Sequence, residues 1–264
     1  MGDDGSLDLQ TDVPHGARIW NYWLGGKDNY AADRAVGDAV REVFPQIADM
    51  AVKSRQFLVR SVRFLADEAG ITQFLDIGTG LPTMQNTHEI AQTVRPSARV
   101  VYVDNDPLVL AHARALLTNV SSEGATAYID ADYNRPDQII DQAKATLDFD
   151  QPIAVLFMGV FGYVEDAADA DAVVKRVMAE VPSGSYLVLM DASDTSDEVR
   201  AAAKAQADMG SPYRLFAVDE IAHWFEGLEL VEPGLVPITH WRPGQIEVGQ
   251  LEHFDAYGGV ARKP

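Results

Sequence analysis

The chain has 264 residues, 47% of them hydrophobic and 23% charged, proportions typical of a globular protein with one substantial hydrophobic core. Its 40 acidic residues outnumber its 21 basic ones, and the formal net charge of -19 disfavours nucleic acid or an anionic membrane as a partner. There is no cysteine, so disulfides, thiolate catalysis and cysteine-ligated zinc are excluded. Because no apolar run reaches ~20 residues and the first residues lack a basic, apolar leader, we expect a cytoplasmic protein with no membrane partner.

Three helical segments are predicted before the first strand. Residues 14–29, "PHGARIWNYWLGGKDN", gather large aromatic residues ahead of a glycine pair, which predicts a helical turn stopped by glycine. Residues 30–43 alternate alanine, valine and charge as a helix does, and Pro45 interrupts them. Residues 46–69 place apolar side chains at helical spacing and predict a long amphipathic helix that Gly70 closes. Residues 1–69 are therefore expected to form an N-terminal helical extension.

From residue 70 onward the chain alternates between predicted strands and helices. The strands are expected at 73–77, 99–103, 126–130, 153–158, 186–190 and 229–231, with a seventh within 246–253. The helices are expected at 84–94, 107–119, 136–146 and 168–181. This alternation predicts an α/β fold with a doubly wound, mostly parallel, seven-stranded sheet. We see no internal repeat or long linker, so residues 70–264 are expected to form one compact domain.

The first two predicted strands end in residue types suited to a ligand. In "DIGTG", Gly78 and Gly80 let the backbone turn tightly and let a ligand approach main-chain N–H groups. A dinucleotide site requires a third glycine where Thr83 stands, and Asp76 repels a diphosphate but suits an ammonium group. Asp104, which follows the second strand, can accept hydrogen bonds from both hydroxyls of a ribose.

The end of the third strand supplies a candidate site for a base. Asp132, in "YIDADYN", can accept a hydrogen bond from the exocyclic amine of adenine, and Tyr133 or Met158 can lie against the purine face. The carboxyl ends of parallel strands meet at one edge of a sheet, so these groups are expected to lie close together. Ammonium, ribose and adenine, met in that order by three successive strand ends, describe S-adenosylmethionine (SAM).

The same segments resemble known families. The series "FLDIGTGLPT", "VVYVDNDP", "AYIDADYNRP", "FMGVFGYVED" and "GSYLVLMDAS" is similar to class I SAM-dependent methyltransferases through most of residues 70–264. The segments "ARIWNYWLGGKDNYAADR" and "LELVEPGLVPITHWRP", together with "FLDIGTGLPT", resemble a bacterial family of SAM methyltransferases of unknown substrate over nearly the whole chain. The resemblance implies a Rossmann-like methyltransferase fold with SAM as cofactor. The broad superfamily usually has another glycine where Pro82 stands, so the loop is expected to leave the strand along a different path.

The resemblance also implies a set of site residues. The cofactor site is expected to consist of Asp76, Gly78, Thr79 and Gly80 at the methionine end, Asp104 and Asn105 at the ribose, and Asp132, Tyr133 and Met158 at the adenine. The N-terminal segment, with Arg18, Tyr22, Lys27 and Asn29, is expected to fold over the cofactor as a lid. Alternatively, its aromatic residues form a hydrophobic staple for the extension. Asp106 is left out of the site because it suits the N-cap of the helix that Pro107 begins.

The expected function is transfer of the sulfonium methyl group to an oxygen or nitrogen of a small molecule. Such transfer chiefly requires that the acceptor be oriented within ~3–3.5 Å of the methyl carbon and that water be kept out, so no catalytic residue is named. His240, in "THWRPG" near the expected substrate edge, is the histidine to test as a base. Relatives often have a histidine near the position of Gly162, and its absence here means that no catalytic group is carried over to that place. No histidine spacing indicates a metal. Glu165 and Asp191 follow the fourth and fifth strands and are interpreted as solvated carboxylates.

Several alternatives stay open. Phe157, Phe161, Tyr163 and Trp241 either line an apolar acceptor pocket or belong to the core. A non-catalytic sensor of SAM or of its demethylated product would use the same binding residues. An NAD-dependent oxidoreductase is a further alternative. The absence of a third glycine at Thr83 and the presence of Asp76 at the end of the first strand argue against it. The sequence indicates no particular oligomeric state.

Overall fold

The computed structural model describes residues 10–83, 85–116, 120–164, 166–244 and 253–264. In these ranges eight strands form one sheet, in the order β3-β2-β1-β4-β5-β8-β6, with β7 paired to β8. The five parallel strands are β1 (Gln73–Ile77), β2 (Arg99–Asp104), β3 (Ala125–Asp130), β4 (Ala154–Met158) and β5 (Tyr186–Ala192). The antiparallel strand β8 (Ala256–Arg262) pairs with β5 and with the short strands β6 (Glu229–Leu230) and β7 (Val236–Pro237).

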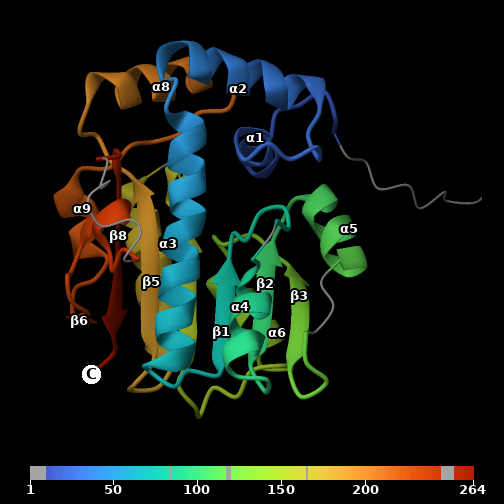
Figure 1. Ribbon diagram of the computed structural model, residues 1–264, viewed down its shortest axis with the longest axis vertical. Helices are drawn as coiled ribbons and strands as arrows, with labels where there is room; N and C mark the ends of the chain where they lie inside the picture. The colour runs from blue at the N-terminus through green and yellow to red at the C-terminus, as the bar shows by residue number, and fades with distance from the viewer. Residues whose placement is uncertain (1–9, 84, 117–119, 165, 245–252) are drawn as a thin grey trace, which may run out of the picture.

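Helices cover both faces of the sheet and one of its ends. The N-terminal helices are α1 (Gly16–Trp23), α2 (Ala31–Val43) and α3 (Ile47–Asp67). The helices that follow are α4 (Thr87–Val94), α5 (Pro107–Leu116), α6 (Pro136–Ala143), α7 (Ala167–Glu180), α8 (Asp197–Asp208) and α9 (Val218–His223). Figure 1 shows α3 lying along one face of the sheet, and α1, α2 and α8 lying across the end to which the parallel strands point.

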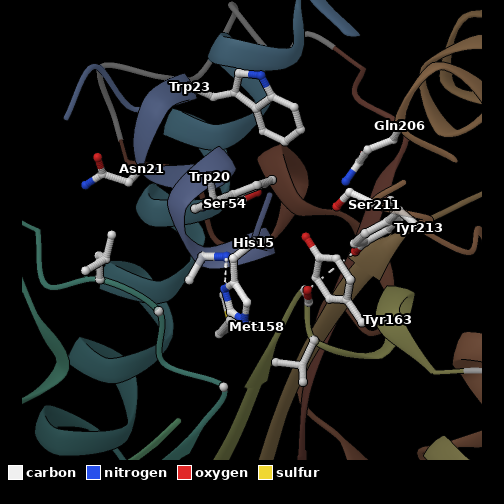
Figure 2. Close-up of a pocket in the computed structure, with 18 of the residues that line it drawn as sticks. His15, Trp20, Asn21, Trp23, Ser54, Met158, Tyr163, Gln206, Ser211 and Tyr213 are labelled. Carbon is white, nitrogen blue, oxygen red and sulfur yellow. Dashed lines mark hydrogen bonds between the residues drawn. The ribbon is translucent and has the colours of Figure 1, made fainter. Parts of the chain in front are cut away.

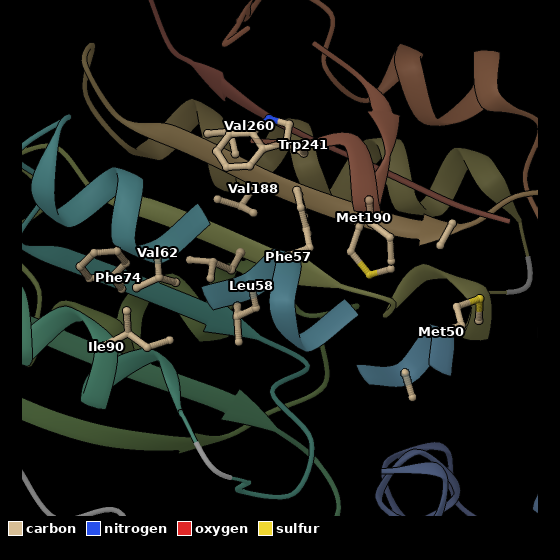
Figure 3. Packing of buried hydrophobic residues seen from close by; sticks show 14 of the residues in the cluster. Met50, Phe57, Leu58, Val62, Phe74, Ile90, Val188, Met190, Trp241 and Val260 are labelled. Atoms are coloured by element: carbon tan, nitrogen blue, oxygen red, sulfur yellow. The ribbon is translucent and has the colours of Figure 1, made fainter. Parts of the chain in front are cut away.

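Two hydrophobic clusters account for the apolar runs that predicted the strands. Successive side chains of a strand point to opposite faces, so Phe74 of β1 packs with α3 and α4 in one cluster while Leu75 packs with α6 and α7 in the other. Figure 3 shows the first cluster, in which Phe57 and Val62 of α3 lie against the sheet. Both faces are buried, and the parallel strands therefore read as continuous apolar segments rather than as alternating ones.

The predicted order of elements is confirmed, with differences at the ends. The helix expected from residue 84 begins at Thr87, because the Asn86 amide donates to the Glu89 carboxylate (2.6 Å) in a capping box. Met84 itself, residues 117–119 of the next expected helix, and nearly all of the strand expected within 246–253 lie outside the described residues. The strand at that place in the sheet is β8, further along the chain, and β7, α8 and α9 are additional elements. None of the described helices is long and apolar enough to cross a membrane.

Candidate active site

A cavity of about 470 Å³ is lined by residues at the carboxyl ends of the parallel strands and by residues of α1, α2 and α8. Part of its lining is drawn in Figure 2. Every residue predicted at the strand ends lines this cavity: Asp76, Gly78, Thr79, Gly80, Asp104, Asn105, Asp132, Tyr133 and Met158. The topology explains this result, because the crossovers between parallel strands bring their carboxyl ends to one edge of the sheet.

The loop after β1 depends on glycine. Gly78 and Gly80 have φ angles of +72° and +66°, in the region that side chains rarely adopt. A Cβ atom at Gly78 would lie 2.4 Å from a methyl group of Val160, so the loop after β1 can pack against the loop after β4 only without a side chain there. The Gly80 N–H donates a hydrogen bond to Asp104 (2.8 Å), which ties the loop after β1 to the end of β2.

Opposite charges meet in the cavity near the end of β1. Asp76 is buried and accepts a hydrogen bond from the Thr87 hydroxyl (2.6 Å). Burial raises the pKa of Asp76 to about 6, although the Thr87 hydroxyl and the positive charge of Arg55 both lower it. Arg55, from α3, lines the same cavity. A carboxylate and a guanidinium side by side suit a zwitterionic amino acid, whose ammonium and carboxylate groups need partners of opposite charge.

Arg55 is a site residue that the sequence reasoning missed. The sequence did contain a signal, since Arg55 stands four residues after Ala51 and three before Leu58, both on the buried face of α3. A charged residue within an apolar helical stripe requires a partner, and in the structure the Arg55 guanidinium donates to the Gln85 carbonyl (3.0 Å) and interacts electrostatically with Asp76.

Asp104 also stabilises the backbone of two loops, a role that the sequence did not predict. One of its carboxylate oxygens accepts hydrogen bonds from the N–H groups of Asn105 (2.9 Å) and Asp106 (3.0 Å), and the other accepts from Gly80. Burial raises the pKa of Asp104, while the N–H groups of Asp106 and Gly80 lower it. A carboxylate offers about four acceptor positions, so three backbone donors leave capacity for a ligand hydroxyl. Asp104 thus orders two loops and lines the cavity at the same time.

The three residues predicted for the adenine all line the cavity, Asp132 and Tyr133 after β3 and Met158 at the end of β4. Asp132 accepts a hydrogen bond from the Asn134 N–H (2.8 Å), so it also stabilises the turn after β3. The Tyr133 ring stands edge-on to Phe161 at 6.1 Å between centroids, and burial raises the pKa of Tyr133 to about 12. Tyr133 and Met158 both line the cavity and present apolar surface suited to a flat base.

Residues of the N-terminal segment border the cavity, but they are not the ones predicted. In the described part of the chain, Arg18, Tyr22, Lys27 and Asn29 do not line it. The lining residues of α1 are Gly16, Ala17, Trp20, Asn21 and Trp23, with His15 and Leu24 beside the helix. The spacing of Gly16, Ala17, Trp20 and Trp23 puts them on one face of a helix, and Arg18 and Tyr22 project from other faces.

The predicted lid residues hold the N-terminal segment together. The Tyr22 hydroxyl donates to Asp38 (2.6 Å), the Asn29 amide donates to Asn21 (3.0 Å), and Lys27 is exposed. The aromatic residues also serve as a staple, since the Trp23 indole donates to the Gly37 carbonyl of α2 (3.2 Å). Helix α1 therefore packs against α2 through its aromatic residues and at the same time forms a wall of the cavity.

Two contacts join α1 to opposite sides of the cavity. Asp106 caps α5, as expected, by accepting from the Leu108 N–H (2.7 Å). Its carboxylate also lies 2.9 Å from His15 Nδ1 and 3.2 Å from Arg18 Nε. At the other side, the Tyr163 ring lies so near Gly16 that a Cβ atom there would meet it at 2.3 Å. Helix α1 therefore spans the strand ends from the loop after β2 to the loop after β4.

The interpretation of Asp191 as a solvated carboxylate is wrong. Asp191 is fully buried near the end of β5 and accepts hydrogen bonds from the Tyr213 hydroxyl (2.5 Å) and from the N–H groups of Phe161 (3.0 Å) and Ala192 (2.9 Å). Burial raises the pKa of Asp191 to about 6, although these donors lower it. Glu165, its companion in that interpretation, lies outside the described residues.

Tyr213 explains why a glycine stands at position 162. A Cβ atom at Gly162 would lie 2.0 Å from the Tyr213 ring, so no histidine fits there. The Tyr213 ring occupies that space, and Tyr213 lines the cavity together with Tyr163, at 5.0 Å between ring centroids. Sequence reasoning missed Tyr213 because its contact with the loop after β4 depends on how the chain returns after α8.

The other candidates lie away from the cavity. His240 is not among the described residues that line it, and its ring nitrogen lies 3.2 Å from the Thr239 hydroxyl. Phe157, Phe161 and Trp241 are fully buried in the two hydrophobic clusters, which settles their assignment in favour of the core. In the described part of the chain, no group of acidic or histidine side chains is arranged to hold a metal ion.

The order of strands and the position of the cavity define the class of Rossmann-like methyltransferases, as the resemblance of the strand-end segments implies. A family model described as S-adenosyl methyltransferase matches residues 3–264, and the chain belongs to that family. The protein is thus a SAM-dependent methyltransferase with SAM as its cofactor. The expected class and cofactor are confirmed, and no finding supports the NAD-dependent alternative.

Solved structures agree with this assignment. A DUF574 family protein from Streptomyces avermitilis MA-4680 is 43% identical, with a TM-score of 0.93 over 97% of this chain and 100% of that one. A candidate methyltransferase from Thermobifida fusca YX is 37% identical, with a TM-score of 0.86 over 99% of each chain. Magnesium protoporphyrin IX methyltransferase from Synechocystis PCC 6803, solved with bound SAM, is 13% identical with a TM-score of 0.55 over 99% of this chain and 100% of that one, a likeness in fold alone. No protein of curated function matches the sequence.

Proposed function

We propose that this methyltransferase transfers the methyl group of SAM to an oxygen or nitrogen of a small molecule that enters the same cavity. The observation that carries the proposal is the continuity of the cavity, which extends from the strand-end residues to apolar side chains of α2, α3 and α8. A volume of about 470 Å³ is within the usual range of small-molecule sites, ~300–1,000 Å³. The net charge of -19 supports the expectation that nucleic acid is not the acceptor, and a cytoplasmic location remains part of the proposal.

The residues present fit SAM at each of its three parts. Asp76 and Arg55 would hold the ammonium and carboxylate of the methionine end, and the glycine loop leaves room beside them. Asp104 and Asn105 would hold the ribose, and Asp132, Tyr133 and Met158 would hold the adenine. SAM supplies a methyl group on a positively charged sulfur, which is already a good leaving group. The protein has to hold the acceptor in line with that methyl and exclude water.

We further propose that residues 1–69 form a cover over a SAM-binding unit of residues 70–264. The two contacts of α1, to Asp106 on one side and to Tyr163 on the other, support this role. In this arrangement Arg18 anchors the cover through its ion pair with Asp106, and Tyr22 and Asn29 maintain its shape. Trp20 and Ala17, rather than the exposed Lys27, are the residues that meet the cofactor.

Incubation with methyl-labelled SAM and bacterial metabolite extracts tests the function. We expect label in a compound that passes a small-molecule filter, formed only with the intact protein. Label in the nucleic acid or protein fraction would contradict a small-molecule acceptor. Absence of transfer across many extracts, with SAM binding intact in calorimetry, would favour the sensor alternative.

The raised pKa of Asp76 predicts a pH dependence of SAM binding. The ammonium group of SAM requires the ionised carboxylate, and at a pKa of about 6 most of that carboxylate is ionised at pH 7 and about a tenth of it at pH 5. The affinity for SAM is therefore present above the pKa of Asp76 and is lost as the pH falls through that value. Calorimetry is expected to show binding about tenfold weaker at pH 5 than at pH 7.

The control for this pH dependence is Asp76→Asn, which has nearly the same shape and no titrating carboxyl. This variant is expected to bind SAM weakly at both pH values, with most of the pH dependence removed. Equal affinity of the unaltered protein at the two pH values, within twofold, would show that Asp76 does not hold the ammonium group.

A further inference from the structure

The part of the cavity away from the strand ends is an apolar chamber. Its walls include Val40 of α2, Met50 and Leu58 of α3, and Val199 and Ala202 of α8. In the described part of the chain, α2 and α8 contribute no charged side chain to the lining. Among the described residues, the lining side chains that are acidic, basic or histidine are His15, Arg55, Asp76, Asp104 and Asp132, of which all but His15 are assigned above to the cofactor. A charged acceptor in this chamber would lose its hydration without gaining a partner.

Uncharged polar side chains gather at one side of the chamber. Figure 2 shows Tyr163, Tyr213, Gln206 and Ser211 in one group, across the cavity from His15 and Trp20. Gln206 and Ser211 are both buried, and the Gln206 amide lies beside the Tyr163 hydroxyl. These groups are suited to a neutral hydroxyl or carbonyl and offer no countercharge to an ion.

Tyr213 lies against Gly159, the residue that follows Met158 of the proposed cofactor site. Its hydroxyl oxygen lies 3.5 Å from the Gly159 carbonyl oxygen, and a Cβ atom on Gly159 would lie 3.8 Å from that hydroxyl and from the Met190 sulfur. Gly159 directly follows β4 and lines the cavity next to Met158. Because Tyr213 donates its hydroxyl hydrogen to Asp191, its oxygen retains the capacity to accept a hydrogen bond from a ligand.

We propose, on the basis of the function proposed above, that the acceptor is an uncharged and largely apolar molecule with a nucleophilic hydroxyl group. Tyr213 is the catalytic residue that receives the proton of that hydroxyl, and Asp191 is the positioning residue that receives the Tyr213 proton in turn. The acceptor oxygen forms its bond to the methyl carbon, while the bond from that carbon to the sulfonium sulfur breaks and its electron pair passes to sulfur. The products are a methyl ether, a neutral thioether and a protonated Asp191, which then returns its proton to water.

The electrostatics of the pair agree with a relay rather than with a free phenolate. Burial and the charge of Asp191 raise the pKa of Tyr213 well above its ordinary value, so Tyr213 keeps its proton until Asp191 takes it. Asp191, with a pKa of about 6, is ionised at neutral pH and is able to take that proton. The titratable groups that face Asp191 are Tyr213, Tyr163 and Tyr133, and none of them changes charge near pH 6.

The first test measures binding of matched aromatic probes to the protein loaded with S-adenosylhomocysteine, the demethylated product. We expect 2-naphthol to bind at least tenfold more tightly than 2-naphthoate and 2-naphthylmethylammonium, because the charged probes lose hydration in the chamber. Tyr213→Phe is expected to weaken 2-naphthol about fivefold, the usual value of one hydrogen bond, and to leave naphthalene unchanged. Equal or tighter binding of a charged probe, no binding of the neutral probes, or no effect of Tyr213→Phe would overturn the proposal.

The matched control is Tyr186→Phe, which removes a tyrosine hydroxyl at the opposite end of β5. This control is expected to change neither probe binding nor product binding. Calorimetry with S-adenosylhomocysteine is run on the same samples, and Tyr213→Phe is expected to keep that affinity within twofold. The labelling experiment tests the proposed function independently of these probes. If the protein binds 2-naphthol but transfers no label to any extract, the proposed function fails while the proposed acceptor class does not.

The second test uses whichever acceptor the labelled extracts provide. Tyr213→Phe is expected to lower kcat by about 100-fold with KM changed less than fivefold, as removal of a general base does. Asp191→Asn is expected to lower kcat. At saturating SAM, where the titration of Asp76 no longer limits cofactor binding, this variant is also expected to lose the fall in kcat that the unaltered enzyme shows below pH 6, a change that a purely structural role would not produce. A charged acceptor, or an unchanged kcat in Tyr213→Phe, would overturn the proposal.

Discussion

Replacement of Asp104 by alanine is expected to weaken SAM binding by at least tenfold. In the proposed site this carboxylate accepts hydrogen bonds from the ribose hydroxyls, and hydrogen bonds to a charged group contribute about 1.5–3 kcal/mol. The same side chain orders the loops after β1 and β2 through the N–H groups of Gly80, Asn105 and Asp106. Its removal therefore costs the cofactor both a direct partner and the shape of the glycine loop. Isothermal calorimetry measures the effect, with low-micromolar binding expected for the unaltered protein and none for NAD.

Asp130→Ala is the control for this prediction. Asp130 ends the neighbouring strand β3 in register with Asp104, but it is exposed and is not among the described residues that line the cavity. The Asp130→Ala substitution removes the same charge from the same edge of the sheet. We expect this variant to bind SAM within twofold of the unaltered protein. If both variants weaken binding equally, the effect is one of overall charge; if Asp104→Ala binds normally, the ribose lies elsewhere.

Replacement of Phe57 by alanine is expected to lower the free energy of unfolding by about 3–5 kcal/mol. The Phe57 ring is fully buried, stands edge-on to Trp241 at 5.6 Å between centroids, and would be 3.0 Å from a Cβ atom on Gly258 of β8. Loss of the ring leaves a cavity that the surrounding strands cannot fill. Urea denaturation followed by circular dichroism measures the change.

Val52→Ala is the matched control for the Phe57 variant. Val52 lies on the same helix, α3, but its residue is 44% exposed, so its loss is expected to cost less than ~1 kcal/mol. A loss below 1 kcal/mol for Phe57→Ala as well would show that α3 is not part of the core on which the sheet depends. That result would leave residues 1–69 as an appendage rather than a cover that shares its core with the rest of the chain.

The parallel strands were predictable because both of their faces are buried. Continuous apolar runs such as Ala154–Met158 are read directly as strands, and the site edge then follows from the topology. Strand β8, "AYGGVAR", gives no such signal. It contains two glycines because Gly258 meets Phe57 and Met190, where a Cβ atom would lie 2.8 Å from the Met190 Cβ. Its strand conformation is imposed by pairing with β5 and not by its own residues.

The residues of the candidate site also fall into those that the sequence predicts and those that it does not. Residues that directly follow strands were predictable, because their position along the sheet edge is set by local sequence. Tyr213 and Trp20 were not predictable as site residues, because their place depends on how α1 and the segment after α8 cross the strand ends. The position of Asp191 at the end of β5 was predictable, but its burial was not, because it depends on the contact with Tyr213. Helix α8 itself had a local signal: Ser196 caps it by accepting from the Val199 N–H (3.1 Å), and two acidic residues stand in its first turn.

A crystal structure with S-adenosylhomocysteine tests the central claim most directly. The account predicts that the amino-acid end of this product lies between Asp76 and Arg55, that its ribose hydroxyls donate to Asp104, and that its sulfur faces the chamber that Tyr213 borders. Product bound outside this cavity, or bound with the ribose pointing away from Asp104, would contradict the account.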